Sequence, residues 1–142
     1  MAINFFSEKI DFKVKYKNIV KKWIRFVIIS EKKSVGNINY IFSSDEYLLK
    51  INVKYLEHDY YTDIITFDYN KGDVINGDIY VSVDRVSENS KIYSNSAREE
   101  FSRVMVHGVL HLLGYKDKTP KQIKVMRKKE DDYLVFLKSN SF

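Results

Sequence analysis

Residues 107–117 read HGVLHLLGYKD and place His107 and His111 four residues apart, with Asp117 six residues after the second histidine. Residues at positions i and i+4 lie on the same face of a helix. Gly114 allows the chain to reverse after the helix, so Asp117 can join the two imidazoles as a third ligand of a divalent ion. Three protein ligands leave a coordination position open, which is typical of catalytic rather than structural zinc sites.

Histidines four residues apart on a helix also occur as surface residues or as hydrogen-bonded core residues, so the spacing alone does not decide between these interpretations. Residues 104–113 are apolar on nearly every side, which predicts a buried central helix. Buried imidazoles need partners, because an unsatisfied buried polar group costs about 1 to 3 kcal/mol. A metal ion would be such a partner. His58 is the remaining histidine and an alternative third ligand.

Three other residues near these motifs have competing interpretations. Asp63 and Asp78 stand at the starts of predicted strands, where a carboxylate caps or turns the chain or else orients a histidine nitrogen. Gly108 follows the first histidine, and its missing side chain would let another element pack closely against the helix. An alanine at Gly108 is then expected to destabilise the protein.

The periodicity of apolar residues predicts an α+β fold. We expect strands at 2–6, 37–42, 64–69 and 77–83, and helices at 17–30, 44–55, 97–113 and from 119 onward. The last two strands flank the turn residues 70–73 and should pair antiparallel. Ser96 and Glu99 form a capping box that starts the histidine-bearing helix. The sequence therefore predicts a mixed sheet of about four strands packed with helices, the histidine-bearing helix at the centre, and fraying over 138–142.

Composition limits the class of protein. The 142 residues, 44% of them hydrophobic, suit a single domain spanning 1–142. The absence of cysteine fits a reducing compartment and excludes thiolate ligands. The first apolar run, residues 3–6, is too short for a signal peptide or a membrane span. We therefore expect a cytoplasmic protein without a membrane partner.

The net charge of +5 and the pI of about 9.2 favour a polyanionic partner, because basic groups near phosphates release counterions. Candidate RNA contacts are the basic side chains near the predicted metal site, together with the isolated histidine: His58, Arg98, Arg103, Lys116 and Lys118. A solvated face that only keeps the protein soluble explains the same charges equally well.

Residues 107–117 resemble the signature of the YbeY family of bacterial rRNA maturation factors, which reads H-G-x-L-H-L-x-G-Y-D-H. Further blocks resemble the same family in the same order: N-x-x-Y at 52–55, T-D-I-I-T-F at 62–67, G-D-I at 77–79 and M-x-x-x-E at 126–130. The chain departs from the family pattern at three positions. Lys116 replaces an aspartate, Asp117 replaces the third histidine, and Leu56 replaces an arginine that is associated with RNA processing.

The resemblance implies a metal-dependent endoribonuclease specific for single strands, acting in rRNA maturation at the 3′ end of small-subunit rRNA and in ribosome quality control. It assigns both catalysis and metal binding to His107, His111 and Asp117. One Zn²⁺ per chain is expected, although iron, manganese or nickel suits the same ligands. The implied partners are rRNA and the small ribosomal subunit, and we expect a monomer.

Two alternatives belong to other functional classes. A non-cleaving RNA-binding factor of ribosome assembly, with a structural metal, would agree with the replaced arginine and the altered third ligand. A metallopeptidase is disfavoured, because peptidases of the H-E-x-x-H type carry their general base after the first histidine, where this chain has Gly108.

Overall fold

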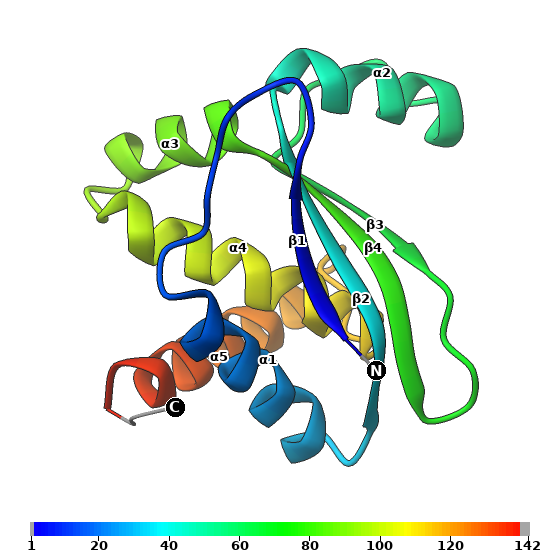
Figure 1. Cartoon of the computed structure of the whole chain (residues 1–142), viewed down its shortest axis with the longest axis vertical. Helices are drawn as coiled ribbons and strands as arrows, with labels where there is room; N and C mark the ends of the chain where they lie inside the picture. Colours follow the sequence, from blue (N-terminus) through cyan, green and yellow to red (C-terminus); the bar gives the residue numbers. More distant parts are fainter. Residues whose placement is uncertain (1, 140–142) are drawn as a thin grey trace.

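The computed structural model describes residues 2–139 and consists of one mixed sheet with five helices (Figure 1). Along the chain the elements are β1 (Ile3–Ser7), α1 (Lys17–Ser30), β2 (Ser34–Ser43), α2 (Asp45–Leu56), β3 (Ile64–Asp68), β4 (Val74–Ser82), α3 (Val83–Ile92), α4 (Ala97–Leu112) and α5 (Pro120–Ser139). The sheet order is β1-β2-β4-β3, with β3 as the antiparallel edge strand. The predicted α+β class and four-stranded mixed sheet are confirmed.

The sheet presents one apolar face to the helices. Ile38, Tyr40 and Phe42 of β2 are buried and alternate with partly exposed residues, as a strand with one covered face requires. Ile79 and Val81 continue this face on β4. Figure 1 shows α1, α4 and α5 gathered on one side of the sheet, with α2 at one end. The helix α4 thus lies in the interior, where the sequence predicted it.

Large aromatic residues of the core bring their polar atoms to main-chain partners. The Nε1 atom of Trp23 on α1 donates to the carbonyl of Tyr133 on α5 at 2.8 Å. The hydroxyl of Tyr40 on β2 donates to the carbonyl of Met105 on α4, also at 2.8 Å. Both side chains are fully buried, so the loss of either hydrogen bond would leave a buried polar group without a partner, which destabilises the fold. The first contact joins α1 to α5, and the second joins the sheet to α4.

The caps and packing of α4 follow from its sequence. The Ser96 side chain accepts from the Glu99 backbone N–H at 3.1 Å, so the helix begins at the predicted residue. The chain leaves the helix through Gly114, whose φ is +103°. A Cβ built on Gly108 would lie 2.8 Å from Ile79 Cγ2 and 2.9 Å from Ile64 Cδ1. Gly108 therefore permits the close approach of α4 to β3 and β4.

One helix was not predicted. The expected strand 77–83 ends at Ser82, and α3 begins at Val83. The Ser82 side chain accepts from the backbone N–H of Arg85 at 3.0 Å and so caps α3. The helix was missed because only Val86 and Ser90 of its residues are buried, which leaves little apolar periodicity. Of the segment expected to fray, Lys138 and Ser139 continue α5, and 140–142 lie outside the described residues.

Across residues 2–139, each helix is either too short or too polar to cross a membrane.

Candidate metal centre

Three side chains converge where α4 ends and the chain turns back. The Nε2 atoms of His107 and His111 are 2.9 Å apart, and each lies 3.3 Å from Oδ2 of Asp117. A tetrahedral ion with bonds of about 2.0–2.2 Å holds its ligand atoms about 3.3–3.6 Å apart. The observed triangle has nearly this size, so the predicted residues form a cluster that could hold a metal ion.

The hydrogen bonds of the two rings determine their tautomers. Nδ1 of His107 lies 2.6 Å from Oε2 of Glu130, and Nδ1 of His111 lies 3.0 Å from the carbonyl oxygen of Tyr115. Both partners are acceptors, so each Nδ1 carries the hydrogen and donates it. The lone pairs of both Nε2 atoms consequently face each other and Asp117. Three facing acceptors repel one another unless a cation lies between them, either a metal ion or a proton on one ring.

Burial and neighbouring charges shift the two histidines in opposite directions. Burial disfavours a charged His107, but the hydrogen bond and charge of Glu130, together with Asp117 and Asp63, outweigh burial and raise the pKa of His107. Burial and the charge of His107 lower the pKa of His111. Of the two rings, His107 therefore takes a proton more readily, and protons compete with a metal ion at low pH.

A polar cleft of about 380 Å³ opens beside His107. Asp63 lines this cleft, and burial raises the pKa of its carboxyl. Asp78, the other aspartate considered as an orienting residue, instead accepts from Nδ2 of Asn39 at 3.0 Å and lines a different hollow. Of the two, only Asp63 shares the cleft of His107.

The basic residues predicted to contact RNA are distributed over several surfaces. Arg103 lines the cleft beside His107, but its guanidinium pairs with Glu130 and Asp131, each at 2.9 Å. Lys116 and Lys118 are exposed on either side of Asp117. The guanidinium of Arg98 lies 4.4 Å from the ring centre of Tyr16 and lines another pocket. Of the four, Arg103 lines the cleft of His107, whereas Lys116 and Lys118 are placed beside Asp117 by the sequence.

His58 is not part of the triangle. It is exposed in the segment between α2 and β3, and its Nδ1 lies 3.0 Å from the Tyr60 hydroxyl. Among the described residues, the cluster suited to a metal consists of His107, His111 and Asp117. Of the two candidates for third ligand, Asp117 is the one that the structure brings to the histidines.

Sequence reasoning missed the groups that orient the two rings. Glu130 is 4% exposed on α5, one turn after the buried Met126. A carboxylate on the apolar face of a helix was the available signal, because such a group needs a buried partner. The position of the Tyr115 carbonyl had a local signal in Gly114, because the backbone N–H groups of Gly114 and Tyr115 donate to the carbonyls of His111 and Leu110, each at 3.0 Å, in a glycine-ended helix cap. The Tyr115 side chain is held by Glu31, which accepts from the hydroxyl groups of Tyr115 and Tyr133 and from Lys129 Nζ at 3.0 Å.

Comparisons with known proteins agree over almost the whole chain. The family model described as Endoribonuclease YbeY matches residues 2–138. An endoribonuclease YbeY of Flavobacterium psychrophilum is 51% identical over 129 residues, which cover 91% of this chain and 92% of that protein. One of Parabacteroides distasonis is 43% identical over 137 residues, covering 96% of both chains.

A solved structure extends the agreement to the fold. The solution structure of a Thermotoga maritima protein aligns with a TM-score of 0.67 and 28% identity, covering 96% of this chain and 89% of that one. One family is indicated by the two histidines on α4, by Asp117 after the turn and by the matching relatives. The chain belongs to the YbeY family of endoribonucleases.

Proposed function

We propose that this protein is a metal-dependent endoribonuclease that cleaves single-stranded RNA, with one Zn²⁺ held by His107, His111 and Asp117. The observation that carries the proposal is the triangle of two Nε2 atoms and one carboxylate oxygen, all acceptors that face one point. Family membership supplies the reaction class, because relatives that match nearly the whole chain carry the name endoribonuclease. Iron, manganese or nickel would suit the same ligands.

The residues around the triangle have distinct tasks in this proposal. A bound divalent ion supplies Lewis acidity toward a phosphoryl oxygen and lowers the pKa of a water molecule. Glu130 and the carbonyl of Tyr115 keep the protons of the rings on Nδ1, which leaves both Nε2 atoms available as ligands. Asp117 contributes negative charge. Lys116 and Lys118 offer positive charge beside Asp117, where a scissile phosphate would approach.

Preference for single strands is supported by exposed aromatic side chains in the segment that runs to Asp63, a residue of the cleft. Tyr55, Tyr60 and Tyr61 are 56%, 56% and 46% exposed in the segment from the end of α2 to β3. Unstacked bases stack on such rings, whereas the bases of a duplex are not available to them. Asn52 holds this segment in place by donating from Nδ2 to the carbonyl of Tyr60 at 2.9 Å. His58 stacks on Tyr60, with ring centres 5.2 Å apart, and would join this surface.

For the cellular role, we propose maturation of the 3′ end of small-subunit rRNA and ribosome quality control, carried out in the cytoplasm by a monomer acting on the small ribosomal subunit. Membership of a family of endoribonucleases supports an RNA substrate, and the net charge of +5 suits an RNA partner. The single domain over 1–142 is part of the same proposal.

A second function is favoured by one specific observation. Leu56 stands where the family has an arginine and is 38% exposed at the end of α2, so this position offers RNA an apolar group instead of a cation. An RNA-binding factor of ribosome assembly that does not cleave, and in which the metal only stabilises the fold, would tolerate this replacement.

Metal content is the first test. Inductively coupled plasma mass spectrometry of the purified protein should find one equivalent of transition metal, and His107→Ala, His111→Ala and Asp117→Ala should each lose it. His58→Ala is the matched control and should keep the metal, because His58 lies outside the triangle. A folded parent protein without metal would contradict the proposal.

Cleavage of a circular single-stranded RNA separates the two functions, because only an endonuclease opens a circle. The parent protein should linearise the circle and leave a duplex of the same sequence intact. His107→Ala and His111→Ala should abolish the linear product while retaining RNA binding. If the circle stays closed with a metal-loaded protein that still binds RNA, the assembly factor is the correct function.

A further inference from the structure

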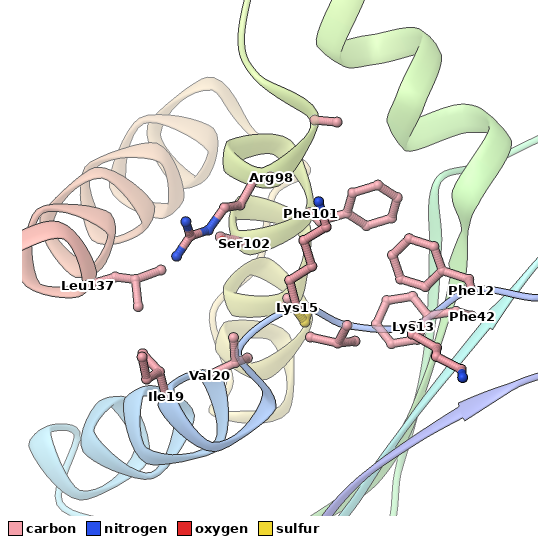
Figure 2. Close-up of a pocket in the computed structure, with 13 residues that line it drawn as sticks. Phe12, Lys13, Lys15, Ile19, Val20, Phe42, Arg98, Phe101, Ser102 and Leu137 are labelled. Carbon is pink, nitrogen blue, oxygen red and sulfur yellow. The ribbon is translucent and has the colours of Figure 1, made fainter. Parts of the chain in front are cut away.

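A second pocket lies on the side of α4 that faces away from the metal centre. Figure 2 shows its walls, which come from the segment before α1, from α1 itself, and from β2, α4 and α5. Arg98 precedes His107 by nine residues, and Ser102 precedes His111 by nine. Nine residues are about two and a half helical turns, so these side chains point to opposite sides of the helix. The pocket therefore does not belong to the cleft beside His107.

The interior of this pocket is apolar. Phe42, Phe101 and Met105 form part of its wall, and Ile19 and Leu137 lie at the end opposite to Phe42 (Figure 2). Its volume is about 180 Å³. An engineered apolar cavity of about 150 Å³ stays dry and binds benzene. This space therefore suits a hydrocarbon group of at least about six carbons.

The rim of the pocket is positively charged. Lys13, Lys15 and Arg98 are among its thirteen lining residues, which include no aspartate or glutamate. In Figure 2 the ammonium group of Lys15 lies beside Phe101, and the guanidinium of Arg98 is directed toward Leu137. Arg98 is held there by its contact with the ring of Tyr16. Lys15 and Arg98 thus place two cations beside an apolar space, where they would attract an anionic head group.

The lining chemistry also excludes a nucleobase as the natural occupant. A base carries several donors and acceptors on its edges, and Ser102 offers the one neutral polar side chain among the lining residues. Each donor or acceptor buried without a partner costs about 1–3 kcal/mol. A hydrocarbon tail carries no such groups.

We propose that this pocket binds an amphipathic carboxylate, with a hydrocarbon tail of about six to eight carbons in the apolar space and the carboxylate at Lys15 and Arg98. A medium-chain fatty acid has this chemistry. The proposal does not depend on RNA cleavage or on the metal, because none of the metal-site residues lines the pocket.

Isothermal titration with hexanoate, heptanoate and octanoate, each below its micelle concentration, tests the apolar part. We expect saturable binding at one site, with the dissociation constant falling about fourfold for each added methylene. Intermolecular nuclear Overhauser effects should connect the octanoate tail to the methyl groups of Ile19 and Leu137. An affinity that does not change with chain length, or contacts only to other parts of the protein, would overturn the proposal.

Charge variants test the rim. The double variant Lys15→Gln with Arg98→Gln should bind octanoate about three- to tenfold more weakly, while its binding of the uncharged 1-octanol stays the same. Lys22→Gln with Lys124→Gln removes the same charge from exposed positions outside the pocket and should bind octanoate like the parent. Equal octanoate binding by both double variants would exclude recognition of the head group. Competitive displacement of octanoate by single-stranded RNA would assign the pocket to nucleic acid instead.

Discussion

The Nδ1 atom of His107 on α4 lies 2.6 Å from the Oε2 atom of Glu130 on α5, so the last helix orients a ring of the central one. Oε1 of Glu130 accepts from Nη1 of Arg103 at 2.9 Å. Burial alone would raise the pKa of Glu130, but the hydrogen bonds of His107 and Arg103, together with the charges of His107 and Arg127, hold it below its usual value. Glu130 therefore stays charged at the site and fixes the tautomer of His107.

Replacing Glu130 by glutamine should weaken metal binding while the fold remains. The amide keeps the shape of the side chain but loses the charge that favours a proton on Nδ1 of His107. Removing such an orienting partner typically costs about 10- to 100-fold in metal affinity. Competition for zinc with a chromophoric chelator measures this change, and circular dichroism confirms folding.

Asp131→Asn is the matched control. Asp131 pairs with the same Arg103 at 2.9 Å but is half exposed, and the structure records no contact between it and His107. Its substitution should leave zinc affinity within about twofold of the parent, since exposed ion pairs contribute little. Equal losses in Asp131→Asn and Glu130→Gln would show that Arg103, rather than the hydrogen bond to His107, maintains the site.

Gly108→Ala should lower the free energy of unfolding by about 1 kcal/mol. Overpacking costs about 1–3 kcal/mol, and the higher helix propensity of alanine offsets up to about 1 kcal/mol of this cost. Chemical denaturation measures the difference. Ile64→Val removes the Cδ1 atom that a new Cβ would meet at 2.9 Å, so the double variant should lose less than the sum of the two single variants. If the losses in the free energy of unfolding simply add in the double variant, the clash is relieved at another contact.

Local sequence signals predicted the parts of the site that lie close together in the chain. The spacing of His107 and His111, the cap at Ser96 and the reversal at Gly114 are all local, and each agrees with the structure. The pairing of β3 with β4 followed from the short turn between them. Such features depend on a few neighbouring residues, so one sequence suffices to predict them.

The remaining features depend on tertiary contacts or on weak patterns. Glu130 reaches His107 across 23 residues of sequence, and spacing does not show which buried carboxylate meets which ring. The contact of Glu31 with Tyr115 spans 84 residues. The helix α3 is polar on most sides, so its cap at Ser82 was its main signal. Parallel pairing of β1, β2 and β4 likewise has no local signature.

Acid should destabilise the protein partly through Glu31. Burial alone would raise the pKa of Glu31, but hydrogen bonds from Tyr115, Tyr133 and Lys129 outweigh it and hold the pKa below its usual value. Because the folded pKa is lowered, this stabilisation is present above the unfolded value of about 4.3. It is lost as pH falls from there through the folded pKa.

Glu31→Gln measures the contribution of this carboxylate. At neutral pH the variant should unfold about 1–3 kcal/mol more easily, because the donors lose a charged acceptor. Its free energy of unfolding should then fall less steeply than that of the parent as the pH drops from about 4.3 through the lowered pKa of the folded state, where the carboxylate takes up its proton. If the free energies of unfolding of the two proteins change with pH in parallel, Glu31 does not cause the acid sensitivity.

Leu56→Arg tests whether the apolar residue at the end of α2 limits RNA handling. Leu56 is 38% exposed, so arginine fits without disturbing the core, and its guanidinium would reach phosphates near the exposed tyrosines. One added phosphate contact should tighten binding of single-stranded RNA, and the slope of log affinity against log salt concentration should steepen by about 0.7.

Val135→Arg adds the same charge at an exposed position of α5 that does not line the cleft, and should change neither the affinity nor the slope. If both variants tighten RNA binding equally, net charge rather than position 56 governs affinity. If Leu56→Arg binds RNA more tightly but cleaves it at the same rate, position 56 contributes to RNA binding and not to cleavage.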